Sequence, residues 1–93
     1  MNYARDIIFH GKVQGVGFRY TAHELSRSFP NISGWVRNEF NGTVAMHLQG
    51  PDDEIDRYLS VLTKESRVAR LIMQTVESPG YADPGISGFR IER

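Results

Sequence analysis

The sequence predicts an α+β sandwich in which two helices cover one face of a single, mainly antiparallel sheet. Three observations predict it. Apolar periodicity alternates in the order strand, helix, strand, strand, helix, strand, and a short fifth strand follows. An Asn-Gly pair between the second and third strands indicates an antiparallel hairpin. The chain has 93 residues, 40% of them hydrophobic, which suits one small core, so we expect residues 1–93 to form a single domain.

The first strand and the first helix follow from the spacing of apolar residues. Residues 4–10 predict a strand that ends at Gly11. A glycine-rich loop follows the strand, and a helix follows the loop until Pro30 ends it. Four apolar residues at helical spacing predict this helix: Phe18, Ala22, Leu25 and Phe29.

A hairpin and a second helix follow. Asn41-Gly42 separates a strand over residues 32–38 from a strand over residues 43–49. Pro51 and the acids of Asp52-Asp53-Glu54 then begin a helix, because acidic side chains favour the positive end of the helix dipole. Its buried stripe is predicted to be Ile55, Tyr58, Leu59 and Leu62.

The last third of the chain completes the pattern. Residues 67–77 predict a fourth strand, although their alternation does not define its register. A loop rich in Gly, Pro, Ser and Asp covers residues 79–88, and residues 89–91 predict a short final strand. This βαββαβ order, with a fifth strand appended, is typical of the ferredoxin-like split βαβ fold.

The composition limits the classes of partner. Eleven basic residues balance eleven acidic ones, so we expect neither nucleic acid nor membrane as a partner. RNA binding, which sheets of this fold can support, ranks last because the aromatic RNA-binding signature is absent. The chain has no cysteine and no signal-peptide pattern, so we expect a cytoplasmic protein, and we expect a monomer.

The loop from Gly11 to Arg19 predicts an anion site. Three glycines within seven residues let the backbone curl and turn successive N–H groups inward, and the N-terminus of the following helix adds positive potential. Arg19 supplies a planar fork that matches phosphate oxygens. No Asp or Glu occurs from Ile7 to His23. The loop therefore predicts binding of phosphate or another small oxyanion, with a tight strand-to-helix turn that holds no ligand as the alternative.

Two motifs resemble the signatures of the acylphosphatase family. The first is Gly11-Lys12-Val13-Gln14-Gly15-Val16-Gly17-Phe18-Arg19. The second is Gly34-Trp35-Val36-Arg37-Asn38, followed by Asn41-Gly42-Thr43-Val44. The resemblance covers nearly the whole chain. It departs from the family's pattern at Asn41-Gly42, where Asp-Gly is frequent but the same turn is expected, and along residues 64–74.

The resemblance implies hydrolysis of acyl phosphates, the mixed anhydrides of a carboxylic acid and phosphate, to a carboxylate and inorganic phosphate. It implies that Arg19 binds the phosphoryl group and that Asn38 orients the attacking water. The backbone N–H groups that join Arg19 in holding the phosphoryl group are those of Val13, Gln14, Gly15, Val16, Gly17 and Phe18.

An arginine, a set of backbone N–H groups and an asparagine are chemically sufficient for acyl phosphate hydrolysis. The carboxylate leaves without protonation, and phosphoryl transfer depends mainly on positioning and on charge stabilisation. An Asn amide both donates and accepts hydrogen bonds, which suits it to hold water. The three histidines, His10, His23 and His47, lack metal-ligand spacing, so we expect no metal and no cofactor.

Arg19, Asn38 and the chain as a whole also have simpler interpretations. Arg19 is otherwise a surface residue, although a cation in a first helical turn opposes the helix dipole. Asn38 is otherwise a strand-end residue that bonds its own backbone. For the whole chain, the alternative is a non-catalytic regulatory domain that binds phosphate or a carbamoyl-phosphate-like ligand. The free-standing length and the presence of both Arg19 and Asn38 favour the enzyme.

Overall fold

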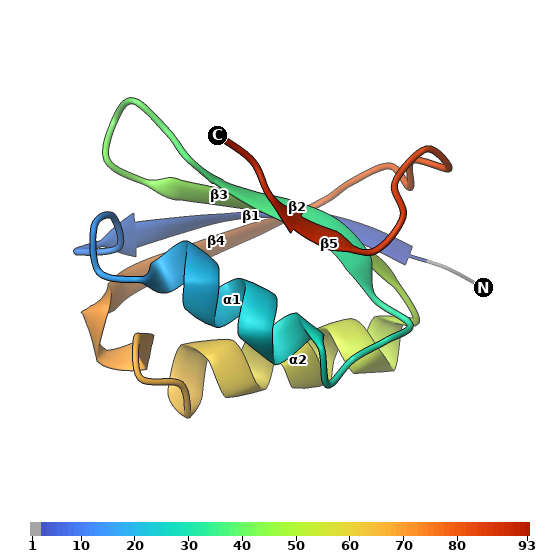
Figure 1. Cartoon of the computed structure of the whole chain (residues 1–93), viewed down its shortest axis with the longest axis horizontal. Helices are drawn as coiled ribbons and strands as arrows, with labels where there is room; N and C mark the ends of the chain where they lie inside the picture. Colours follow the sequence, from blue (N-terminus) through green and yellow to red (C-terminus); the bar gives the residue numbers. More distant parts are fainter. Residues whose placement is uncertain (1–2) are drawn as a thin grey trace.

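A five-stranded sheet with both helices on one face forms the molecule (Figure 1). The structure, a computed structural model, describes residues 3–93. The strands lie in the order β4-β1-β3-β2-β5, so the predicted ferredoxin-like arrangement is confirmed. The strands are β1 (Tyr3–Gly11), β2 (Ser33–Asn38), β3 (Val44–Gly50), β4 (Ile72–Pro79) and β5 (Phe89–Ile91), and the helices are α1 (Phe18–Ser26) and α2 (Asp52–Lys64).

Strand pairing is antiparallel except at one edge. β1 pairs with β3 and β4, and β2 pairs with β3, all in antiparallel register. β5 pairs in parallel with β2, so that Ile91 lies opposite Val36. This parallel edge brings the end of the chain beside the end of β2, a placement that the sequence pattern did not define.

The prediction of a strand over residues 67–77 is wrong at its beginning. Ala69–Leu71 form a 3₁₀ turn, η1, and β4 begins at Ile72. The chain must cross there from α2 to the edge of the sheet, and Val68 is buried at 1% exposure within the crossing. β4 is an edge strand on which Met73 is 84% exposed and Val76 is 43% exposed, which explains why its alternation is weak.

The first helix is shorter than its apolar spacing predicts. α1 ends at Ser26, and the chain continues in a tight turn in which the Phe29 amide donates to the Ser26 carbonyl oxygen. Phe29 nevertheless packs against the core, with its ring edge-on to that of Tyr58 at a centroid distance of 5.6 Å. Helical spacing therefore identified the packing of Phe29 but not its backbone conformation.

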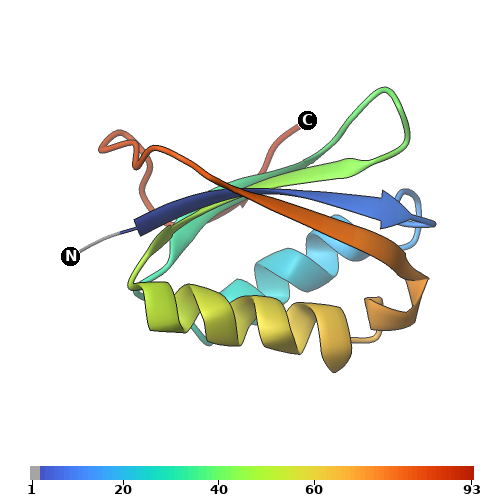
Figure 2. The same ribbon diagram turned by 180° about the vertical axis from the view of Figure 1, so that it is seen from behind.

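The core lies between the sheet and the two helices (Figure 2). Its largest side chains, including Phe9, Met46 and Leu62, are at most 1% exposed, and burying each contributes about 1.5–3 kcal/mol. Tyr58 of α2 donates a 2.7 Å hydrogen bond to the Ala22 carbonyl oxygen of α1. Burial raises the pKa of the Tyr58 phenol above its ordinary value, because the charged form would lose its water.

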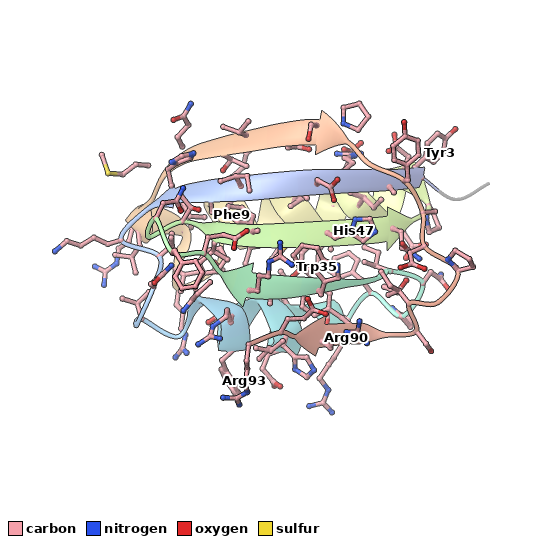
Figure 3. All side chains as sticks on the ribbon, turned by 90° about the horizontal axis from the view of Figure 1, so that it is seen from above. Tyr3, Phe9, Trp35, His47, Arg90 and Arg93 are labelled. Carbon is pink, nitrogen blue, oxygen red and sulfur yellow. The ribbon has the colours of Figure 1, made fainter. Side chains whose placement is uncertain are left out.

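The helix-free face of the sheet carries a buried polar cluster. Figure 3 looks onto this face, where Trp35 of β2 and His47 of β3 lie side by side with their rings stacked at 6.0 Å. His47 is 6% exposed and contacts Asp6 through Nδ1 at 2.7 Å and Gln49 through Nε2 at 2.8 Å. The Gln49 amide in turn pairs with both backbone groups of Asp83. The cluster thereby fixes the 80–88 loop over the sheet.

Candidate active site

The loop between β1 and α1 has the curled backbone that its glycines predict. Gly15 and Gly17 have positive φ angles of 73° and 82°. At Gly15 a Cβ atom would meet nothing within 4 Å, so the backbone conformation, and not lack of space, requires glycine there. Gly17 is the N-cap of α1, and no described side chain caps the helix by a hydrogen bond. The first N–H groups of α1 therefore face the loop without a side-chain acceptor.

Buried residues at each end hold this loop. Val13 and Phe18 are each 1% exposed, and the Phe18 ring packs on Phe9 with the centroids 4.9 Å apart. The Gln14 side chain adds a polar anchor, because its Nε2 donates to the Glu39 carbonyl oxygen at 2.7 Å and to the Thr43 carbonyl oxygen at 2.9 Å. Gln14 was predicted to act through its backbone amide, and its side chain ties the loop to the β2–β3 hairpin.

The hairpin turn accounts for the departure from Asp-Gly. The Asn41 Oδ1 accepts hydrogen bonds from the Thr43 amide at 3.1 Å and from the Thr43 hydroxyl at 2.6 Å. Aspartate carries the same acceptor oxygen, so either residue can make this turn. The turn therefore holds the Thr43 carbonyl oxygen that Gln14 contacts. Thr43 directly precedes β3, and Asn38 is the last residue of β2.

A cavity of about 200 Å³ brings the predicted site residues together. It lies between the loop, the first turn of α1 and the ends of β2 and β5. Among the predicted residues, Gln14 lies instead between the loop and the hairpin, and Val16 is 39% exposed. The cavity is lined by Val13, Gly15, Gly17, Phe18, Arg19, Tyr20, Asn38, Ile91 and Arg93.

Three of the lining residues were not predicted: Tyr20, Ile91 and Arg93. Ile91 and Arg93 reach the cavity because β5 runs parallel to β2, and Figure 3 shows Arg93 beyond the end of β5. Only the pairing of β5 could have indicated them. Tyr20 follows Arg19 directly and is 58% exposed, so it lines the rim of the cavity.

Asn38 and Arg19 both lack partners within the described structure. The Asn38 Oδ1 is buried and is the one such side-chain oxygen or nitrogen without a hydrogen bond among residues 3–93. Leaving a buried carbonyl oxygen unpaired costs about 1–3 kcal/mol, so this oxygen favours a donor from outside the described residues. Arg19 forms no ion pair with any described acid, and the first turn of α1 carries no acidic residue. The cavity thus combines positive charge with an unused acceptor.

Residues 3–93 contain no candidate metal-binding site. Among residues 3–93, no group of three His, Asp or Glu side chains lies close enough to hold a metal ion. No helix in this part of the chain is long and apolar enough to cross a membrane.

Comparison with known proteins identifies the family. A sequence model of the acylphosphatase family matches residues 5–91. The acylphosphatase of Salinibacter ruber is 36% identical over 83 residues, which cover 89% of this chain and 85% of the relative. The crystal structure of acylphosphatase from Bacillus subtilis superposes with a TM-score of 0.85 at 26% identity over 100% of both chains.

A fold likeness extends to larger proteins. Full-length HypF, crystallised in a phosphate- and nucleotide-bound form, matches 100% of this chain with 12% of its own length, at a TM-score of 0.82 and 22% identity. That likeness concerns the fold alone. The family match over residues 5–91 and the identity to relatives of similar length decide the assignment: the chain belongs to the acylphosphatase family of hydrolases.

Proposed function

We propose that this protein hydrolyses acyl phosphates to a carboxylate and inorganic phosphate, with Arg19 binding the phosphoryl group and Asn38 orienting the attacking water. One observation carries the proposal: a single 200 Å³ cavity is lined by the glycine loop, Arg19 and Asn38, whose Oδ1 is buried without a partner among residues 3–93. No described acid competes for the guanidinium, so it is free for an anion.

Phosphoryl binding rests on three donors of different kinds. The guanidinium of Arg19 offers parallel N–H groups that match two phosphate oxygens. The amides of residues 13–18 surround the remaining oxygens, since left-handed Gly15 and Gly17 curl the backbone there. The uncapped N-terminus of α1 adds its dipole. The backbone donors are held in place before the substrate arrives by buried Val13 and Phe18, and transition-state stabilisation depends on donors placed in advance.

Water attack uses Asn38. Its Oδ1 accepts a hydrogen bond from the water and fixes the direction of the water lone pair toward phosphorus. The water oxygen forms a bond to phosphorus while the bond from phosphorus to the acyl oxygen breaks, and the carboxylate departs with the electron pair. The water proton passes to a phosphoryl oxygen. Carboxylate is a stable leaving group, so the step needs no general acid.

The test is hydrolysis of benzoyl phosphate in the presence of EDTA. We expect turnover by the wild type and a fall of about 100-fold or more for Asn38→Ala, with the affinity for inorganic phosphate retained within a few-fold. Asn31→Ala is the matched control, because that exposed side-chain amide forms its one described hydrogen bond with Glu54 and lies outside the cavity.

Each outcome separates the alternatives. Near-normal hydrolysis by Asn38→Ala removes that residue from the mechanism. If the wild type binds phosphate but does not turn over, the protein is the non-catalytic binding domain. The proposal keeps the expectation of a cytoplasmic monomer, which size-exclusion chromatography and cell fractionation test.

A further inference from the structure

We propose that Arg67 is a positioning residue for the phosphoryl group, acting from the far side of the glycine loop and favouring the doubly charged phosphate. The inference rests on the proposed function. It concerns a residue from the segment that departs from the family's pattern, and Arg67 lies outside the lining of the cavity.

The fold places Arg67 directly against the loop. Its Nε donates a 3.1 Å hydrogen bond to the Thr21 Oγ1 in the first turns of α1. Its Nη2 lies 3.1 Å from the point where a Cβ on Gly17 would be. The guanidinium therefore occupies the space that a side chain at residue 17 would fill, beside the N-terminus of α1.

The turn that carries Arg67 is held by its neighbours. Ser66 donates a 2.6 Å hydrogen bond through Oγ to the Leu62 carbonyl oxygen at the end of α2. Val68 is buried at 1% exposure. With Ser66 and Val68 fixed on either side, the backbone at Arg67 is fixed too, and the bond to Thr21 directs the side chain toward the loop.

The positive charges near the N-terminus of α1 are not balanced by acidic side chains among the described residues. Two guanidinium groups, those of Arg19 and Arg67, flank the positive end of α1, where cations are unfavourable. Neither forms an ion pair within residues 3–93, and the first turn of α1 has no acid. The five arginines that do form ion pairs with acids are Arg5, Arg27, Arg37, Arg57 and Arg90.

Arg19 and Arg67, which form no ion pair with a described acid, belong to the same end of the molecule. Figures 1 and 2 both show the glycine loop and the connection from α2 to β4 at that end. A shallow hollow of about 620 Å³ beside the connection is lined by Lys64, Arg67 and Arg70, among others. An anion in the loop would relieve the repulsion, and a dianion gains more from each cation than a monoanion does.

A purely structural role for Arg67 predicts different effects on stability and on phosphate affinity. If Arg67 only fastens the connection to α1 through Thr21, its loss lowers the unfolding temperature and leaves phosphate affinity alone. If it positions the phosphoryl group, its loss weakens phosphate binding in proportion to the charge on the phosphate. Binding and folding are therefore measured on the same variants.

The experiment titrates inorganic phosphate into each variant by calorimetry, at one pH below and one above the second ionisation of phosphate. We compare Arg67→Gln with Arg70→Gln, which removes the same charge from the same hollow. Arg67→Lys keeps the charge, and Thr21→Val removes the acceptor of the Arg67 Nε.

We expect Arg67→Gln to weaken dianion binding on the order of fivefold and monoanion binding distinctly less. Arg67→Lys should recover part of the loss, and Thr21→Val should shift affinity in the same direction by a smaller factor. Arg70→Gln should stay within about twofold of the wild type. Inhibition of benzoyl phosphate hydrolysis by phosphate should follow the same order.

Equal effects of Arg67→Gln and Arg70→Gln at both pH values overturn the inference, as does a lowered unfolding temperature with unchanged phosphate affinity. A wild type that binds phosphate but does not hydrolyse benzoyl phosphate overturns the proposed function alone, because the phosphate titration still measures Arg67. A wild type that hydrolyses benzoyl phosphate but binds no phosphate overturns the inference alone, and one that does neither overturns both.

Discussion

Arg5 and Arg19 stand near opposite ends of β1, and the chain surrounds them differently. Arg5 contacts three carboxylates, those of Asp52 and Asp56 at 2.7 Å and that of Glu77 at 3.1 Å, and its side chain is 17% exposed. Partial burial alone would lower the pKa of Arg5, but the hydrogen bonds to these carboxylates outweigh it and raise the pKa above its ordinary value. Arg19 has no described carboxylate partner at all.

The difference in ion pairing predicts that the Arg5 end contributes to stability and the Arg19 end to function. At the Arg5 end, the chain supplies the counter-charges itself, so the arrangement is complete in the folded protein. At the loop end, Arg19, Arg67 and the start of α1 are all positive, and in the proposed function an anion from solution supplies the missing counter-charge. Substitutions at the two ends should therefore affect different measurements.

The largest effect is expected for Arg19. Arg19→Ala and Arg19→Lys should each lower kcat/KM for benzoyl phosphate by about 100-fold or more, because a point charge does not replace a planar fork on the phosphoryl oxygens. The stability of Arg19→Lys should be unchanged, and that of Arg19→Ala should be unchanged or rise by a few tenths of a kcal/mol, since only the Ala variant removes an unpaired cation from the positive end of α1. Enzyme assays and urea unfolding on the same preparations check both parts. Substantial activity in Arg19→Lys would show that charge without the fork suffices.

The sequence predicted this loop end in part. The curl of the glycine loop follows from its glycines, and the predicted ferredoxin-like fold accounts for the end of β2, with Asn38, lying near that loop. Arg67, Ile91 and Arg93 did not follow, because each reaches the loop end through a connection or a strand edge whose register depends on the whole fold. The polar anchor of Gln14 was missed because its two acceptors are carbonyl oxygens, which the sequence does not mark.

The buried polar cluster on the helix-free face extends the comparison, because it too is completed within the chain. Asp83 donates through its amide and accepts through its carbonyl oxygen, which fixes Gln49 with Oε1 toward His47. The two ring nitrogens of His47 thus lie within hydrogen-bond distance of Asp6 Oδ1 and Gln49 Oε1.

Gln49→Ala breaks this cluster. We expect a loss of about 1–3 kcal/mol of unfolding free energy, because buried partners lose their hydrogen bonds, while kcat should be nearly unchanged. Hydrogen exchange at the Asp83 amide should accelerate far more than exchange in the strands. Uniform acceleration across the sheet would mean that the cluster does not act on the loop specifically.

At the Arg5 end, Arg5→Met keeps the apolar stem and removes the counter-charge of three carboxylates. We expect a loss of about 1–2 kcal/mol, because exposed ion pairs contribute little singly but here leave like charges together. Activity toward benzoyl phosphate should match the wild type. The paired charge of Arg57, which contacts Asp53 at 3.2 Å on the exposed face of α2, offers the control Arg57→Met, expected to cost a few tenths of a kcal/mol.

Apart from the control Arg57→Met, the smallest effect at neutral pH is expected for Tyr58, whose pKa is raised by burial. Tyr58→Phe loses the hydrogen bond to the Ala22 carbonyl oxygen, which should cost about 1 kcal/mol. The folded-state pKa of Tyr58 lies above the unfolded value of 10.0, so its stabilising contribution is complete below pH 10.0 and is lost as the pH rises further.

Urea unfolding over a series of pH values crossing 10.0 therefore distinguishes Tyr58 from Arg5. The wild type should lose stability above that pH by up to about 1.4 kcal/mol per pH unit, and Tyr58→Phe should lose less, so that the two curves converge. Arg5→Met should run parallel to the wild type through the same range, since the Arg5 guanidinium stays charged at every pH of the series. Parallel curves for Tyr58→Phe and the wild type would mean that the alkaline loss arises elsewhere than in the buried phenol that joins α1 to α2.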